Sequence, residues 1–239
     1  MPEPVPAPRL RHQGPPLGWL ATLYTVFFCT GLWFVTIFSG RPYYPGPWEP
    51  ASTIVAFFQA RPDAAERCAF FHFGAAIVLG LFTACIANQM RFLGVRAAGV
   101  NIALFGGFAT ALNMMGGAAT MWAMAQPGIA RDPGVIAALY YLSFALGGVG
   151  FSAPLGLLMA GISIPALFLH RLPRWVGVLG IVLGVCGELS WLNLLFPKML
   201  FLIPLTRFPG FVWLVAAGFL LPNTLPAAKN SAAETAAAF

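Results

Sequence analysis

The chain has 239 residues, of which 59% are hydrophobic and only 8% are charged. A soluble domain carries about 25% charged residues, so the composition excludes a water-soluble globular domain and indicates a protein whose solvent is the bilayer. The net charge of +6 does not indicate a nucleic-acid partner, because the Lys and Arg residues stand singly between apolar runs and form no basic face.

Six apolar runs follow one another along the chain, and each exceeds the ~20 residues that a helix needs to cross a bilayer. We therefore predict an all-α fold, a polytopic membrane helical bundle in one domain over residues 17–222. The first run is too long for a signal-peptide core and no A-x-A site follows it, so we expect an uncleaved helix. The flanking residues 1–16 and 223–239 are predicted to be disordered tails. The expected spans are residues 17–40, 68–90, 98–121, 135–169, 175–196 and 199–221.

The polar connection between the first two spans carries the signal of an extra helix. Within residues 50–60, the apolar side chains Ile54, Phe57 and Phe58 recur at helical spacing. This pattern predicts a short amphipathic helix that lies on the outer membrane surface. A loop with a few apolar residues is the alternative.

The fourth run, residues 135–169, is too long for one straight span. Tilt, a kink at Pro154 or an interfacial start near Tyr140 and Tyr141 would absorb the excess.

Two spans carry stripes of small residues, which let helices approach closely in lipid. The stripes are therefore expected to face other helices. They comprise Gly99, Ala103, Gly106, Thr110, Asn113, Gly117 and Thr120 in the third span, and Gly177, Gly180, Gly184 and Gly187 in the fifth.

The last two spans form a predicted hairpin with one charge in each arm. Glu188 lies nine residues before Pro197, and Arg207 lies nine residues after Lys198. In antiparallel helices both charges then sit ~13 Å below the turn. An intramembrane acid and base at one depth indicate a functional site, with each the expected partner of the other. A purely structural ion pair is the alternative.

Other polar and aromatic side chains fall at a similar depth when residues are counted along each span. Arg207, Glu188, Asn113, His72, Trp191 and Tyr140 are the predicted binding residues, and Glu188 and His72 are also the candidates for catalysis. We expect the site to open outward beneath residues 41–67. Asn113 as an interhelical hydrogen bond and His72 as an interfacial group are the alternatives.

Several kinds of chemistry lack their motifs in this sequence. The four cysteines show no CxxC or CxxH spacing, so we expect no metal site. His12, His72 and His170 fall at different depths, so we expect no haem. No Walker loop, H-E-x-x-H or G-x-S-x-G occurs, and no cofactor is expected.

The short loops predict the orientation. Arg91 and Arg96 bracket one loop, and Arg171 and Arg174 lie in another, with no acidic residue in either. Basic residues in short loops favour the cytoplasmic side. We therefore predict that both termini are cytoplasmic.

Residues 169–184, with the sequence LHRLPRWVGVLGIVLG, resemble a family of bacterial inner-membrane proteins of unknown function that carry a leucine-proline-arginine turn before a glycine-rich span. The resemblance covers residues 17–195 in outline. It implies the same fold and a place in the bacterial inner membrane, and it implies no catalytic residue.

Two classes of function are consistent with these patterns. The first is a binding or accessory protein that contacts membrane lipids and holds a lipophilic ligand, or docks a membrane-protein partner, at an outer-leaflet polar site. The second is a membrane-embedded isomerase or hydratase with Glu188 as general acid and base. The first is favoured, because a neighbouring Arg lowers the pKa of a carboxylate and makes it a poor base near neutral pH.

Overall fold

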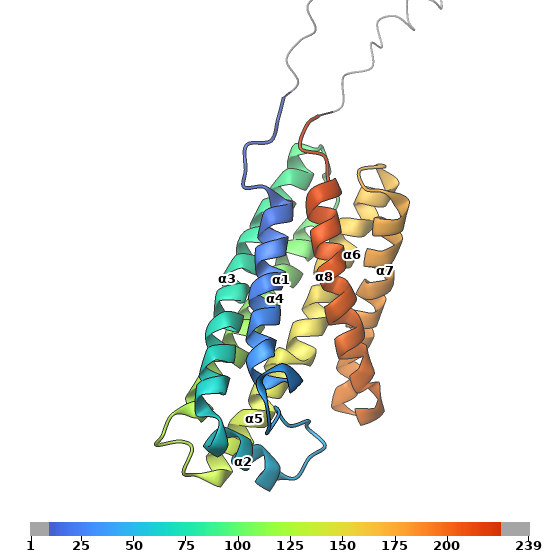
Figure 1. Cartoon of the computed structure of the whole chain (residues 1–239). Helices are drawn as coiled ribbons and strands as arrows, with labels where there is room; N and C mark the ends of the chain where they lie inside the picture. Colours follow the sequence, from blue (N-terminus) through green and yellow to red (C-terminus); the bar gives the residue numbers. More distant parts are fainter. Residues whose placement is uncertain (1–9, 226–239) are drawn as a thin grey trace, which may run out of the picture.

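The computed structural model describes residues 10–225 and confirms an all-α bundle of membrane type. Figure 1 shows the long helices side by side in one elongated bundle, with both ends of the described chain at the same end. Six helices are long and apolar enough to cross a membrane, as the sequence predicts. They are Leu17–Val35, Pro62–Phe92, Gly99–Ala125, Pro133–Phe168, Arg174–Leu194 and Pro197–Leu220.

The helices pack in an order that differs from their order in the chain. Helix α1 packs against α3 and α8, α4 packs against α3 and α6, and α7 packs mainly against α6. Two short 3-10 segments, η2 and η3, connect α7 to α8. The elements are α1 (Leu17–Val35), η1 (Ile37–Ser39), α2 (Ala51–Ala60), α3 (Pro62–Phe92), α4 (Gly99–Ala125), α5 (Pro133–Gly147), α6 (Val149–Phe168), α7 (Arg174–Leu189), η2 (Ser190–Leu194), η3 (Pro197–Phe201) and α8 (Leu202–Leu220).

The glycine stripe of α7 faces α6, which confirms that it is a helix-packing surface. A methyl group at Gly187 would lie 2.7 Å from the carbonyl oxygen of Ser152 and 2.8 Å from Cα of Gly156. On α4, a methyl group at Gly106 would lie 2.5 Å from the carbonyl oxygen of Pro154. Only glycine permits this approach of two backbones.

The long fourth run is divided at a pair of glycines. Helix α5 ends at Gly147 and α6 begins at Val149, with Gly148 between them at φ −93° and ψ −94°. Pro154 lies inside α6, so the break is six residues before the proline that the sequence suggested. Irregular backbone at membrane depth is tolerated where protein buries it or where it lines a cavity.

Helix α2 confirms the predicted short helix, but its apolar face contacts protein. Ile54, Phe57 and Phe58 are 0%, 1% and 0% exposed, and the ring of Tyr44 lies edge-on to Phe57 with 5.4 Å between centroids. The expectation of an apolar face turned toward lipid was therefore wrong. Hydrophobic side chains that meet an apolar wall of the protein gain burial there instead.

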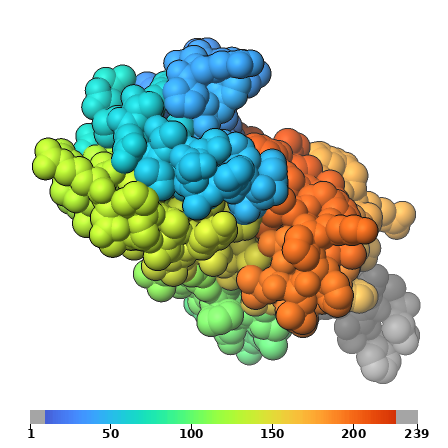
Figure 2. Space-filling model, turned by 90° about the horizontal axis from the view of Figure 1, so that it is seen from below, coloured from blue at the N-terminus to red at the C-terminus, as the bar shows by residue number. Residues whose placement is uncertain are grey.

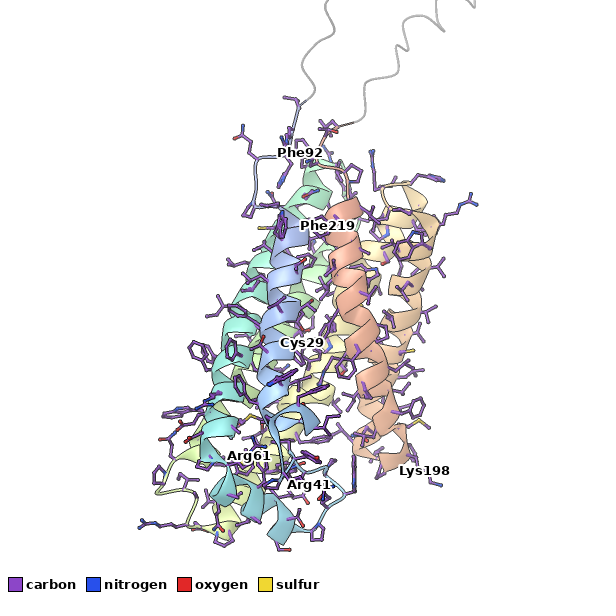
Figure 3. The ribbon with its side chains drawn as sticks, in the orientation of Figure 1. Cys29, Arg41, Arg61, Phe92, Lys198 and Phe219 are labelled. Atoms are coloured by element: carbon purple, nitrogen blue, oxygen red, sulfur yellow. The ribbon has the colours of Figure 1, made fainter. Side chains whose placement is uncertain are left out.

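We call residues 36–61 the cap, because they cover one end of the bundle. Arg61 holds the cap together: its guanidinium donates to the carbonyl oxygens of Gly40, Pro42 and Ser39 at 2.5, 3.1 and 3.1 Å. Figure 3 shows Arg41 and Arg61 at this end of the molecule, together with Lys198.

The opposite end is closed by the two ends of the described chain. Arg11 and Thr224 form an isolated antiparallel bridge, and the side-chain amide of Gln89 donates to the carbonyl oxygen of Pro222 at 2.9 Å. The prediction of two disordered tails did not anticipate this pairing. Most of both predicted tails, residues 1–9 and 226–239, lie outside the described residues.

Candidate functional site

A cavity of about 360 Å³ lies beneath the cap, among α1, α3, α4, α5, α6 and α8. Its walls take in about two turns of most of these helices, which corresponds to a depth of ~10 Å. The cap segment from Tyr44 to Trp48 forms the roof. Figure 2 views this end of the molecule, where the cap, α5 and the η3–α8 segment come together.

Arg207 lies at the floor of this cavity, ten residues into the span Pro197–Leu220. Its Nη2 donates a hydrogen bond to the carbonyl oxygen of Gly147, the last residue of α5. The guanidinium carbon lies 4.7 Å from the ring centre of Phe151 and 5.5 Å from that of Phe28. A helix C-terminus and two aromatic faces are both favourable surroundings for a cation.

The predicted partnership of Arg207 with Glu188 is not found. Within residues 10–225 no carboxylate forms an ion pair with Arg207, whose Nε is buried without a hydrogen-bond partner. Glu188 does not line the cavity, and its Oε1 is also buried and unpartnered. The pairing was predicted from equal residue counts on the two sides of the hairpin turn. In the structure, α7 turns its Gly187 face to α6, whereas Arg207 lines the cavity.

His72 lies in the cavity wall, against the same aromatic ring as Arg207. Its imidazole stacks on Phe28 with 4.5 Å between ring centres and an angle of 24°. Its Nε2 donates to the carbonyl oxygen of Phe28 at 3.3 Å, and Nδ1 lies 3.7 Å from Sγ of Cys68. The structure therefore brings His72 and Arg207 together around Phe28.

Tyr140 is fully buried and also lines the cavity. Its hydroxyl donates to the carbonyl oxygen of Pro45 at 2.6 Å, and its ring centre lies 5.6 Å from that of Tyr44. Burial raises the pKa of the Tyr44 hydroxyl well above its usual range. Tyr140 thus fastens the cap to the bundle and keeps an apolar roof over the cavity.

Asn113 and Trp191, two other predicted binding residues, lie outside the cavity. Asn113 donates from Nδ2 to the carbonyl oxygen of Gly150 at 2.8 Å, which is the interhelical hydrogen bond that the alternative interpretation proposed. Trp191 is 51% exposed on η2. Of the six predicted binding residues, only Arg207, His72 and Tyr140 line the cavity.

Sequence reasoning missed the aromatic floor of the site. Phe28 and Phe151 are 3% and 1% exposed, but phenylalanine is so common in this chain that its count carried no signal. The break at Gly147 and Gly148 had a detectable signal, because two adjacent glycines interrupt an apolar run that is too long for one span.

These features define an integral-membrane helical bundle with a capped, mainly apolar cavity and an arginine at its floor. In the part of the chain that the structure describes, no group of three or more His, Cys, Asp or Glu side chains could hold a metal ion. No family model, curated protein or solved structure matches the chain, so the resemblance to an inner-membrane family stays a prediction.

Proposed function

We propose that this membrane protein binds a lipophilic small molecule in the capped cavity, with Arg207 meeting the polar head of the ligand. The observation that carries the proposal is a cation inside a span, in a cavity, with no carboxylate of residues 10–225 paired to it. Ionisable residues inside membrane helices generally mark functional sites. The volume of about 360 Å³ falls within the ~300–1,000 Å³ that is usual for small-molecule sites.

The positions of the acid–base candidates favour binding over catalysis. A general base must lie within hydrogen-bond reach of the proton that it removes, and Glu188 does not line the cavity. His72 does, but both of its ring nitrogens are engaged by the protein: Nε2 donates to the carbonyl oxygen of Phe28, and Nδ1, which then carries the lone pair, faces Sγ of Cys68 at 3.7 Å. Neither candidate therefore offers a free acid or base in the cavity, and the isomerase or hydratase alternative is not supported.

A variant that fills the cavity tests this function. A methyl group at Gly147 meets no atom within 4 Å, so Gly147→Leu should project its side chain into the cavity and displace the ligand. The measurement is native mass spectrometry of protein released gently from its membrane. We expect a copurified lipophilic molecule on the wild type, and at least a tenfold lower bound fraction on Gly147→Leu.

Gly80→Leu is the matched control, because the nearest side-chain atom to a methyl group there is on Phe108 at 4.0 Å and Gly80 does not line the cavity. This control should keep the ligand at the wild-type level. Equal occupancy in both variants, or the absence of any bound molecule from the wild type, would contradict the proposed function.

We further propose that the protein lies in a bacterial inner membrane with the cap outside and both termini in the cytoplasm. The proposal rests on the pairs of Arg residues at and beside the loops that follow α3 and α6, and these loops lie at the end opposite the cap. Short basic loops remain on the cytoplasmic side. The cavity then belongs to the outer half of the membrane.

Single cysteines in a background without the four native ones test this orientation. Gly128→Cys, in the exposed turn after α4, should react with a membrane-impermeant maleimide in intact cells. Ala97→Cys, in the exposed loop after α3, should react only after permeabilisation. The reverse pattern would place the cap and the cavity on the cytoplasmic side.

A further inference from the structure

We propose that the head group held by Arg207 is a carboxylate on a single hydrocarbon chain. This inference rests on the proposed function and names the chemical class of its ligand. It follows from the charge, the free hydrogen-bond donors and the dimensions of the cavity.

The charge of the cavity indicates an anion with one negative charge. Among the residues that the structure describes, Arg207 is the one Lys or Arg that lines the cavity, and no Asp or Glu lines it. A buried cation is stabilised by a nearby opposite charge much more strongly than by a neutral dipole. A carboxylate balances this charge, whereas a phosphate monoester with about −1.5 to −2 charges would leave negative charge uncompensated in apolar surroundings.

The donors of Arg207 match the acceptors of a carboxylate. Of its three guanidinium nitrogens, only Nη2 donates to a protein acceptor, the carbonyl oxygen of Gly147. Nε is buried and unpartnered, and Nη1 makes no hydrogen bond to the described residues. Arginine presents Nη1 and Nη2 as a planar fork that fits two carboxylate oxygens, and Nη2 carries a second N–H besides the one that donates to Gly147. A ligand carboxylate would therefore pair with Nη1 and with the second N–H of Nη2, which the described residues leave free.

The dimensions favour one chain over two. The cavity volume of about 360 Å³ is near the lower end of the ~300–1,000 Å³ range. With the head on Arg207 at the floor, a hydrocarbon chain lies along Met114 and Ile203 toward Trp48 in the roof, and all three of these side chains line the cavity. These apolar side chains provide the contact that such a chain needs.

Isothermal titration of the purified full chain in a maltoside detergent tests this inference with three probes of equal chain length. The probes are octanoate, octanol and octyl phosphate, at neutral pH. We expect octanoate to bind at least tenfold more tightly than either of the others. Arg207→Met should weaken octanoate binding at least tenfold and leave octanol unchanged, and Arg207→Lys should retain part of the preference because it keeps the charge.

Arg131→Met, at an exposed position outside the cavity, is the matched control and should bind octanoate like the wild type. Equal affinity for octanoate and octanol, both lost in Gly147→Leu, would refute the carboxylate and leave the proposed function standing. Tighter binding of octyl phosphate would also refute it. Failure of all three probes to bind the wild type would count against both proposals. The comparison of the three probes on the wild-type protein tests the inference even if Arg207→Met does not fold.

Discussion

Gly187→Val should break the packing of α7 on α6 and leave most of the protein misfolded or aggregated. A β-carbon at this position would lie 2.7 Å from the carbonyl oxygen of Ser152 and 2.8 Å from Cα of Gly156. Both are backbone atoms of α6, so they cannot rotate away as a flexible side chain would. We expect a loss at or above the upper end of the ~1–3 kcal/mol that overpacking usually costs.

The measurement is unfolding in mixed micelles, with the monodisperse fraction after size-exclusion chromatography as a second readout. Gly80→Val makes the same chemical change on α3, where the nearest side-chain atom is at 4.0 Å, and it should remain within ~0.5 kcal/mol of the wild type. Similar stability for Gly187→Val and Gly80→Val would show that α6 and α7 are not packed in this close register.

Phe58→Ala should loosen the cap by about 3–5 kcal/mol, the usual range for removing a buried Phe side chain. Phe58 is 0% exposed, and its ring packs edge-on to Phe57 at 5.2 Å and to Tyr44 at 6.1 Å. Alanine would leave an empty volume between α2 and the end of the bundle. Hydrogen exchange of the α2 amides, followed by mass spectrometry, should speed up strongly as the cap opens more often.

Phe70→Ala provides the comparison, because Phe70 is 73% exposed on α3 and its removal leaves no enclosed cavity. Its effect on exchange in α2 should be within error of the wild type. Exchange of the α2 amides that is equally slow in Phe58→Ala and Phe70→Ala would contradict the packing of Phe58 between α2 and the end of the bundle.

Residue counting along the chain located the helices, but it did not predict which side chains of different helices meet. The apolar runs located six helices, and the glycines of α7 identified a packing face, because both features repeat along one helix. Glu188 and Arg207 lie on different helices, and the rotation of each helix about its own axis depends on neighbours that are distant in sequence. Equal residue counts from the turn therefore did not bring the two charges together.

The burial of α2 against the rest of the protein could not be predicted from the sequence, for a related reason. Ile54, Phe57 and Phe58 form the same apolar face whether the helix lies on lipid or on protein. The choice is decided by Tyr44 and Tyr140, which supply the opposing surface from other segments. A pattern within one helix carries no information about that surface.

The aromatic floor of the cavity also bears on how the protein enters its membrane. Phe28 and Phe151 belong to α1 and α6, and both precede α8 in the chain. A polypeptide emerges from the ribosome with its amino-terminal part first, so both rings are synthesised before Arg207. The helices that carry both rings have therefore been synthesised before the charged final helix partitions into the bilayer, and contact of its guanidinium with those rings would offset part of the cost of placing a cation there.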